Sequence, residues 1–130
     1  MQVKVSHENT ILKKRKILTK AVQRAAELLD ISRKELVFIL GQSEPTFSRI
    51  FKDNAIKGLF DPTSKEGQLA ILFVRLFKNL DVLFGGNSEQ AKKWLRSHNY
   101  HLSDSPIHLI QSIEGFVVVI QYLDSMRGKN

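Results

Sequence analysis

Apolar and polar residues alternate with helical spacing over residues 10–31, TILKKRKILTKAVQRAAELLDI. Apolar positions recur three or four residues apart, as they do on one face of an amphipathic helix. Thr10 is a suitable N-cap, because its hydroxyl can accept a hydrogen bond from an otherwise unpaired amide. The pattern predicts a first helix that begins near Thr10 and carries these apolar residues: Ile11, Leu12, Ile17, Leu18, Ala21, Val22, Ala25, Leu28 and Leu29.

Two shorter helices separated by a glycine are predicted next. Ser32 and Glu35 have the spacing of a capping box, which opens a helix, and Gly41 can close that helix with a positive φ. A second short helix is expected to open at Ser43, with Pro45 in its first turn. Two short helices that meet at a glycine turn are typical of a helix-turn-helix. The second of them places Phe47, Ile50 and Phe51 on one face.

Residues 53–64, which contain Gly58 and Pro62, predict a linker between two halves of the chain. Ser64 is the expected N-cap of a long helix, which is apolar on most faces and therefore belongs in a core or an oligomer interface. A further helix is expected after Asn87 or Ser88, and a last one over residues 113–126. In the last helix the residues predicted to face inward are Phe116, Val119, Ile120 and Leu123. No convincing strand is found, so the predicted fold class is all-α.

Composition limits the alternatives. A chain of 130 residues forms one domain or two small subdomains. It has no cysteine, no apolar run long enough for a membrane span and no apolar region of a signal peptide, so we expect a cytoplasmic protein without a membrane partner. The net charge is +7, with twelve Lys/Arg against six Asp/Glu in residues 1–60 and eight against seven in residues 61–130. This asymmetry favours a polyanion as the partner of the first half.

No catalytic or metal-binding motif is argued from the sequence. His98 and His101 lie near Asp104, but in a loop and without the spacing of two ligands on one helix. Ser103, Ser105 and His108 resemble a nucleophilic set only by local crowding, since no nucleophile elbow is present. We therefore expect a protein that is not an enzyme, with no cofactor and no metal.

The helix-turn-helix resembles the Xre type of bacterial repressors. The matching positions are Leu36, Val37, Leu40, Gly41, Phe47 and Ile50, although Val37 and Gln42 stand where alanine and a branched apolar residue are commoner. The resemblance implies DNA binding by the helix that begins near Ser43. With Phe47 and Ile50 inward, we expect the residues toward the groove to be Gln42, Ser43, Glu44, Thr46, Ser48 and Arg49. Lys13, Lys14 and Lys16 are expected to contact phosphates, unless they form only a solvated face.

Residues 94–115, WLRSHNYHLSDSPIHLIQSIEG, are too broken for one amphipathic helix. With the flanking segments they resemble the toxin-binding domain of Xre/MbcA/ParS antitoxins. The matching positions are Trp94, Leu95, Asn99, Leu102, Pro106, Leu109, Ile110, Ser112, Gly115 and Gly128, and Ser103-Asp104 replaces a commoner glycine pair. With the predicted linker as the boundary, the resemblance implies a DNA-binding region at residues 1–60 and a toxin-binding domain at residues 64–130. It also implies a cognate toxin, usually of the RES class that consumes NAD⁺, operator DNA as a second partner, and dimers.

The toxin-binding residues are predicted in two groups. Polar or exposed positions of the loop provide Asn99, Leu102 and Ser103, and the end of the chain provides Asp124, Arg127, Lys129 and Asn130. Arg127 and Lys129 are expected on a free tip that reaches into a toxin cleft, or else they only complement the negative end of the last helix. The predicted function is an antitoxin that neutralises its toxin and represses its operon. The alternatives are a stand-alone dimeric helix-turn-helix regulator and, last, an enzyme.

Overall fold

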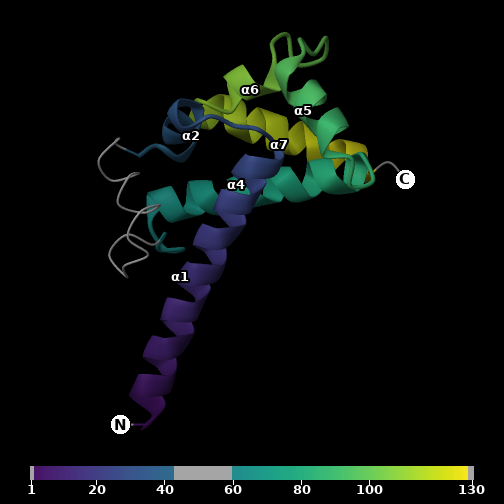
Figure 1. The fold of residues 1–130 in the computed structure, drawn as a ribbon. Helices are drawn as coiled ribbons and strands as arrows, with labels where there is room; N and C mark the ends of the chain where they lie inside the picture. The colour runs from purple at the N-terminus through teal and green to yellow at the C-terminus, as the bar shows by residue number, and fades with distance from the viewer. Residues whose placement is uncertain (1, 43–59, 129–130) are drawn as a thin grey trace.

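The computed structural model describes residues 2–42 and 60–128, with side chains described from Glu8 onward. Within these ranges the chain forms helices and no strand, which confirms the predicted all-α class (Figure 1). The helices are α1 (Gln2–Leu28), α2 (Arg33–Leu40), α4 (Lys65–Leu83), α5 (Ser88–Arg96), α6 (Pro106–Leu109) and α7 (Ile113–Gly128). No helix in the described ranges combines the length and the apolar content that a membrane crossing requires.

Helix α1 is longer than predicted. It begins at Gln2 and passes through Thr10 without interruption, so the expected N-cap at Thr10 is wrong. Its first half projects beyond the rest of the chain, whereas its second half crosses α4 (Figure 1). Val22, Ala25 and Leu29 are buried at this crossing. No glycine or proline before Thr10 stops the helix, and Gln2, Lys4 and Glu8 favour it.

Helix α2 begins and ends as its sequence predicts. The Ser32 hydroxyl accepts from the Glu35 amide at 3.1 Å, and the Glu35 carboxylate accepts from the Ser32 amide at 2.9 Å, which confirms the capping box. Gly41 closes the helix with φ of +63°, a conformation that costs other residues free energy. The second helix of the predicted helix-turn-helix lies outside the described residues.

The described end of the predicted linker is packed rather than free. Phe60 is buried, and its amide donates to the hydroxyl of the buried Thr19 on α1 at 3.1 Å. Gly67, in the first turn of α4, lies so close to this segment that a Cβ would approach the Asp61 carbonyl oxygen to 1.7 Å. Residues 60–64 therefore join α1 to α4 by direct contact, which composition alone did not indicate.

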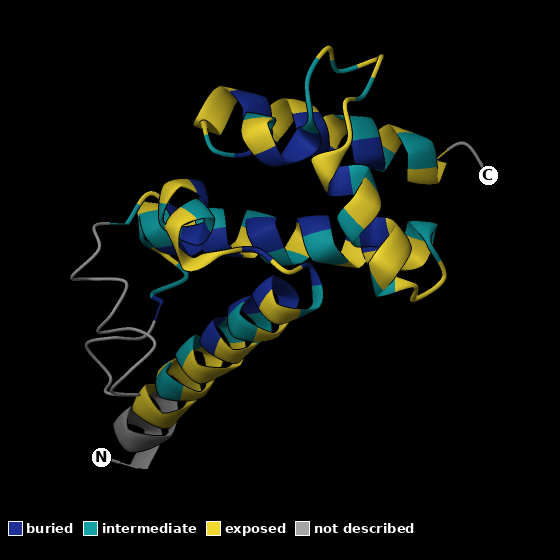
Figure 2. Cartoon of the chain, turned by 45° about the horizontal axis from the view of Figure 1, so that its top comes forward, coloured by how far each residue is buried: buried dark blue, intermediate teal, exposed yellow. Residues whose placement is uncertain are grey.

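Helix α4 lies at the centre of the fold, as its apolar sequence predicts. It packs against α1, α2, α5 and α7, and its N-cap is Ser64 as expected. Figure 2 shows its buried residues alternating with exposed ones, and the most deeply buried large side chains are Phe73, Leu76 and Leu80. One strip remains open to solvent, because Ile71 is 45% exposed and Val82 is 59% exposed.

The C-terminal helices cover the other side of α4. Phe116, Val119, Ile120 and Leu123 of α7 are buried, which confirms the predicted inward face. Pro106 occupies the first position of α6, as expected. The tight entry to α7 depends on Gly115, where a Cβ would lie 2.1 Å from the Leu109 carbonyl oxygen.

Candidate functional site

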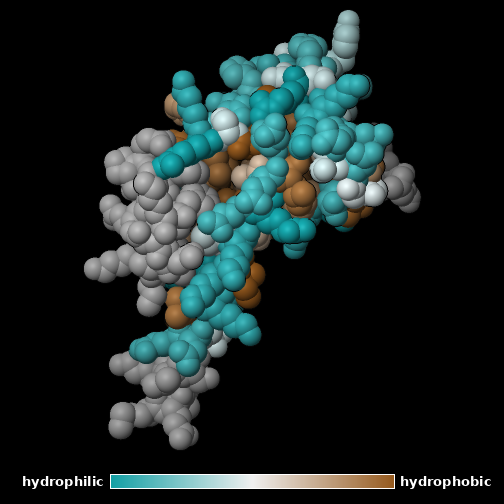
Figure 3. All heavy atoms as spheres, in the orientation of Figure 1, coloured by the Kyte–Doolittle hydropathy of each residue, from teal (hydrophilic) through white to brown (hydrophobic). Residues whose placement is uncertain are grey.

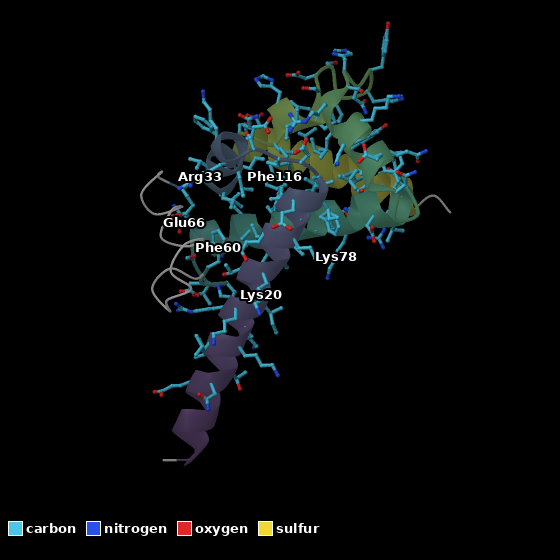
Figure 4. The ribbon with its side chains drawn as sticks, in the orientation of Figure 1. Lys20, Arg33, Phe60, Glu66, Lys78 and Phe116 are labelled. Atoms are coloured by element: carbon cyan, nitrogen blue, oxygen red, sulfur yellow. The ribbon has the colours of Figure 1, made fainter. Side chains whose placement is uncertain are left out.

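One exposed face of α1 is strongly basic. Lys13, Lys16, Lys20 and Arg24 follow one another at intervals of three or four residues, which places them on the same side of the helix. All four are exposed, and a hydrophilic band follows α1 across the molecule (Figure 3). Lys20, labelled in Figure 4, lies on this helix. Lys13 and Lys16 were predicted from the sequence, whereas Lys20 and Arg24, which continue the same spacing, were not.

Two neighbours of this face are not part of it. Lys14 is exposed about a quarter turn away. Arg15 points instead toward the segment before α4, where its guanidinium lies 3.4 Å from the Asp61 carboxylate. Hydrogen bonds from Thr63, and then the charge of Arg15, lower the pKa of Asp61. Arg15 therefore holds α1 to the core rather than offering a free charge.

The predicted base-reading residues are described only in part. Gln42 follows the end of α2, is half-buried, and donates its amide to the Val37 carbonyl at 3.1 Å. Ser43, Glu44, Thr46, Ser48 and Arg49 lie outside the described residues. The structure therefore places the lysines of the candidate DNA surface and one of the six groove positions.

The loop between α5 and α6 is organised around Asn99. Its side-chain oxygen accepts from the amides of His101 at 2.9 Å and Leu102 at 3.1 Å. Its backbone pairs with Asp104, whose carbonyl accepts from the Asn99 amide at 3.0 Å. An asparagine side chain that accepts from the backbone amides two and three residues later supplies hydrogen bonds that a helix or strand would otherwise provide, and so stabilises a turn. The predicted binding residue Asn99 is therefore also the residue that shapes the loop.

Leu102 and Ser103 point in different directions from this turn. Leu102 is half-buried and packs against the core, whereas Ser103 is exposed. Ser103 has φ of +61°, a left-handed conformation usually taken by glycine. The exposed part of the loop thus includes Ser103, while Leu102 anchors the loop.

An aromatic group beside the loop was not predicted. His101 stacks on Tyr122 of α7 with 5.9 Å between ring centroids, and Trp94 stacks on the same tyrosine at 6.4 Å. Tyr100 is 93% exposed, and its ring meets that of His98 edge to face. Aromatic side chains with one open face are common anchors in protein interfaces. These rings come from α5, the loop and α7. Their positions along the chain do not predict that they come into contact.

Asp104 and the His108 ring share a hydrogen bond across one turn, with 2.5 Å between Oδ2 and Nδ1. The hydrogen bond from His108, followed by the amide of Ser105, lowers the pKa of Asp104. Within the described ranges, no serine hydroxyl bonds the other nitrogen of the His108 ring. Among the described residues no three His, Asp or Glu side chains are grouped as metal ligands. The pair is thus a positioning contact at the start of α6.

Asp124 and Arg127 lie on a different side of α7 from Tyr122. The Asp124 carboxylate accepts from Arg75 and, at 3.0 Å, from the buried Asn79, both on α4. Arg127 donates to the Asn79 side-chain oxygen at 2.6 Å. Arg127 is therefore in the last turn of α7 and is held by α4, so its expected place on a free tip is wrong. Lys129 and Asn130 lie outside the described residues.

The loop and the described members of the second group, Asp124 and Arg127, are consequently not brought together. His101 of the loop lies against Tyr122, and Tyr122 and Asp124 differ by about 200° around the axis of α7. A single small partner surface would contact one group or the other. The sequence could not show this, because Asp124 and Arg127 appear as exposed polar positions until the position of α4 is known.

A polar contact joins α2 to α5 across the fold. Arg96 donates to both Glu35 oxygens, at 2.8 and 2.9 Å, and to the Asp30 carbonyl at 2.8 Å. The Arg96 hydrogen bond is the main reason why the pKa of Glu35 falls to about 2. Glu35 therefore caps α2 and ties it to the C-terminal half at once.

The described residues define an all-helical protein with a basic face on α1 and a separate aromatic loop surface in its C-terminal half. Comparison with known families makes this specific. Residues 13–75 match the model of the antitoxin Xre-like helix-turn-helix domain, and residues 79–129 match the model of the antitoxin Xre/MbcA/ParS C-terminal toxin-binding domain. No curated protein is similar enough to count as a match. Both predicted domain resemblances are confirmed, and together they support a type II antitoxin that binds DNA.

Proposed function

We propose that this protein neutralises a cognate toxin of the RES class, which consumes NAD⁺, and represses its own operon as a dimer in the cytoplasm. The observation that carries the proposal is the union of an antitoxin helix-turn-helix domain with an antitoxin toxin-binding domain in one chain. The proposed activity is binding rather than catalysis. We keep the division into a DNA-binding region at residues 1–60 and a toxin-binding region at residues 64–130 as part of the proposal.

Co-expression with the product of the neighbouring gene tests the toxin part. The proposal expects the two proteins to purify as a complex and the cells to keep their NAD⁺, whereas the partner alone should deplete it. A complex without NAD⁺ loss by the free partner would remove the RES class but keep the antitoxin. Absence of any complex would remove the antitoxin function.

For the toxin contact we propose the loop residues Asn99, Leu102 and Ser103 and the end of the chain, with Asp124, Arg127, Lys129 and Asn130. Removing Lys129 and Asn130 leaves the bond between Arg127 and Asn79 in place. A loss of inhibition in this variant therefore assigns a contact to the tail itself. If inhibition persists at equal concentration, the contact lies on the loop, and Tyr100→Ala should weaken it because that ring is 93% exposed.

For the operator we propose base reading by Gln42, Ser43, Thr46, Ser48 and Arg49, and phosphate contacts by Lys13, Lys14 and Lys16. Arg49→Ala should cost about 1–3 kcal/mol in operator binding if it contacts a guanine, and less if it contacts a phosphate. Fluorescence anisotropy at fixed salt measures this. An unchanged affinity would count against the helix near Ser43 as the reader.

The second candidate is a stand-alone dimeric regulator. One observation favours it: Ile113, Val117 and Val118 on the outer face of α7 are 69%, 40% and 44% exposed. Such a strip is suited to pairing with a second copy. Ultracentrifugation of the chain alone and with the neighbouring gene product separates the two functions, because only the antitoxin forms a defined complex with that product.

A further inference from the structure

A hollow of about 340 Å³ opens where α1, α4 and the end of α7 meet. We call its apolar lining, from α1 and α4, the floor. We call its basic lining, from α4 and α7, the rim. Lys78, labelled in Figure 4, projects from α4 on the side where α1 crosses it. The lining residues are Leu18, Ile71, Val74, Arg75, Lys78 and Arg127.

The rim holds more positive than negative charge. Arg75 pairs with Asp124. Among the described residues, Arg127 donates only to the neutral Asn79 side chain, and Lys78 forms no ion pair. Three cations thus face one carboxylate. Asn79 is 1% exposed and bonds both Asp124 and Arg127, so the guanidinium of Arg127 is held in place. A fixed cationic group loses little conformational freedom when an anion binds.

We propose that this pocket receives an acidic segment of the toxin, with one apolar side chain on the floor and neighbouring carboxylates on Lys78 and Arg127. The proposal rests on the toxin-binding function proposed above. The apolar floor distinguishes it from a phosphate contact, because a DNA backbone has no side chain to fill the hollow. A second copy fits poorly by charge, since the whole chain carries +7.

The position of the pocket agrees with a toxin contact that involves both domains. Leu18, Ile71, Val74 and Arg75 belong to the helix-turn-helix match, and Arg127 belongs to the toxin-binding match. A segment seated here would contact α1 and α7 together. It would also lie on the side of α7 that carries Asp124, away from the loop at Asn99.

Charge reversal at the rim tests the anionic part. Lys78→Glu in the full chain should weaken the Kd for the neighbouring gene product about tenfold or more, and should reduce its salt dependence. The matched control is Lys65→Glu, which changes another exposed lysine on the same helix about 20 Å away. Lys78→Gln is the second variant, because it removes the charge without adding repulsion. An unchanged Kd in both Lys78 variants, with unchanged thermal unfolding, would overturn the proposal.

Removal of the apolar floor tests the other part. Ile71→Ser should weaken the same complex about fivefold, whereas Ile17→Ser, which changes another exposed apolar residue, should not. Overlapping 15-residue peptides from the partner provide the direct probe. The bound peptides should combine Asp or Glu with one large apolar residue and should fail to bind Lys78→Glu.

The same variants separate the other outcomes. If Lys78→Glu lowers operator affinity but not the Kd for the partner, the pocket contacts DNA and the proposal is wrong. If it changes only the monomer–dimer equilibrium, the occupant is a second copy and the proposal is equally wrong. If the wild-type protein does not bind the partner at all, the proposed function is wrong as a whole. If the wild type binds and no pocket variant changes the Kd, only the pocket proposal is wrong.

Discussion

The basic face of α1 and the loop at Asn99 offer binding groups in opposite ways. The α1 face is a repeat of exposed lysine and arginine residues on a regular helix, and its positions follow from helical spacing alone. The loop has no repeat, and it is held by specific bonds from Asn99 and by one tight glycine contact after it. The first surface should tolerate substitution without loss of fold, whereas the second should not. The free energy of unfolding is the quantity that tests this difference.

The largest effect is expected at Gly115. Gly115→Ala should lower the free energy of unfolding by about 3 kcal/mol, because its Cβ would collide with the Leu109 carbonyl and push α6 from α7. Urea denaturation followed by circular dichroism measures it. Gly128→Ala is the matched control, since nothing lies within 4 Å of its added Cβ, and it should change stability little. Equal effects at the two glycines would contradict the proposed importance of this contact.

The next effect concerns the link between α2 and α5. Glu35→Gln should lower stability by about 1–2 kcal/mol at pH 7, a value reduced for solvent screening because Arg96 is 43% exposed. The folded pKa of Glu35 is about 2 and its ordinary value is 4.5, so the ionised form is favoured by folding. This stabilisation is therefore present above pH 4.5 and is lost as pH falls toward 2.

A pH series of unfolding curves for wild type and Glu35→Gln checks this prediction. The difference between the two proteins should shrink between pH 4.5 and pH 2. Glu27→Gln, at an exposed glutamate on α1, should show no such difference. If the difference in free energy of unfolding between wild type and Glu35→Gln does not depend on pH, the effect comes from the cap geometry rather than from the charge on Glu35.

A smaller effect of opposite sign is expected in the loop. Ser103→Gly should raise stability by about 0.5 kcal/mol, because the left-handed backbone costs serine more free energy than glycine loses in chain entropy on folding. Ser125→Gly in the regular helix α7 should lower it by about 0.5 kcal/mol. Thermal unfolding of the two variants measures whether stability rises in Ser103→Gly and falls in Ser125→Gly. A loss of stability in Ser103→Gly would argue against this loop conformation.

The smallest effect on folding is expected on α1. The double variant Lys13→Gln/Lys16→Gln should change the free energy of unfolding by less than about 0.5 kcal/mol. Its operator affinity should instead depend less steeply on salt, by about 0.9 in the logarithmic slope for each phosphate contact removed. Anisotropy titrations at several salt concentrations measure the slope. An unchanged slope would show that these lysines form only a solvated face.

Sequence reasoning succeeded where a feature is local. The capping box at Ser32, the αL residue Gly41 and the inward face of α7 depend on residues a few positions apart, and all three are confirmed. It failed where the determining partner is distant. Arg127 looked free because Asn79 is 48 residues away, and the Tyr122 stack needs three separate segments. The predicted start of α1 was wrong for another reason: a residue suited to capping, such as Thr10, does not begin a helix when no glycine or proline interrupts the helix before it.

The boundary between the two family matches falls inside one unbroken helix. The helix-turn-helix match ends at residue 75 and the toxin-binding match begins at residue 79, while α4 runs from Lys65 to Leu83. A chimera that joins the first domain of one antitoxin to the second domain of another therefore cannot be spliced in a loop. The junction would lie within a helix. The two parent sequences would have to place their core-facing residues at the same helical positions, with side chains of similar size on both faces. Exchange of toxin specificity between such proteins should accordingly succeed more often when α4 is transferred whole.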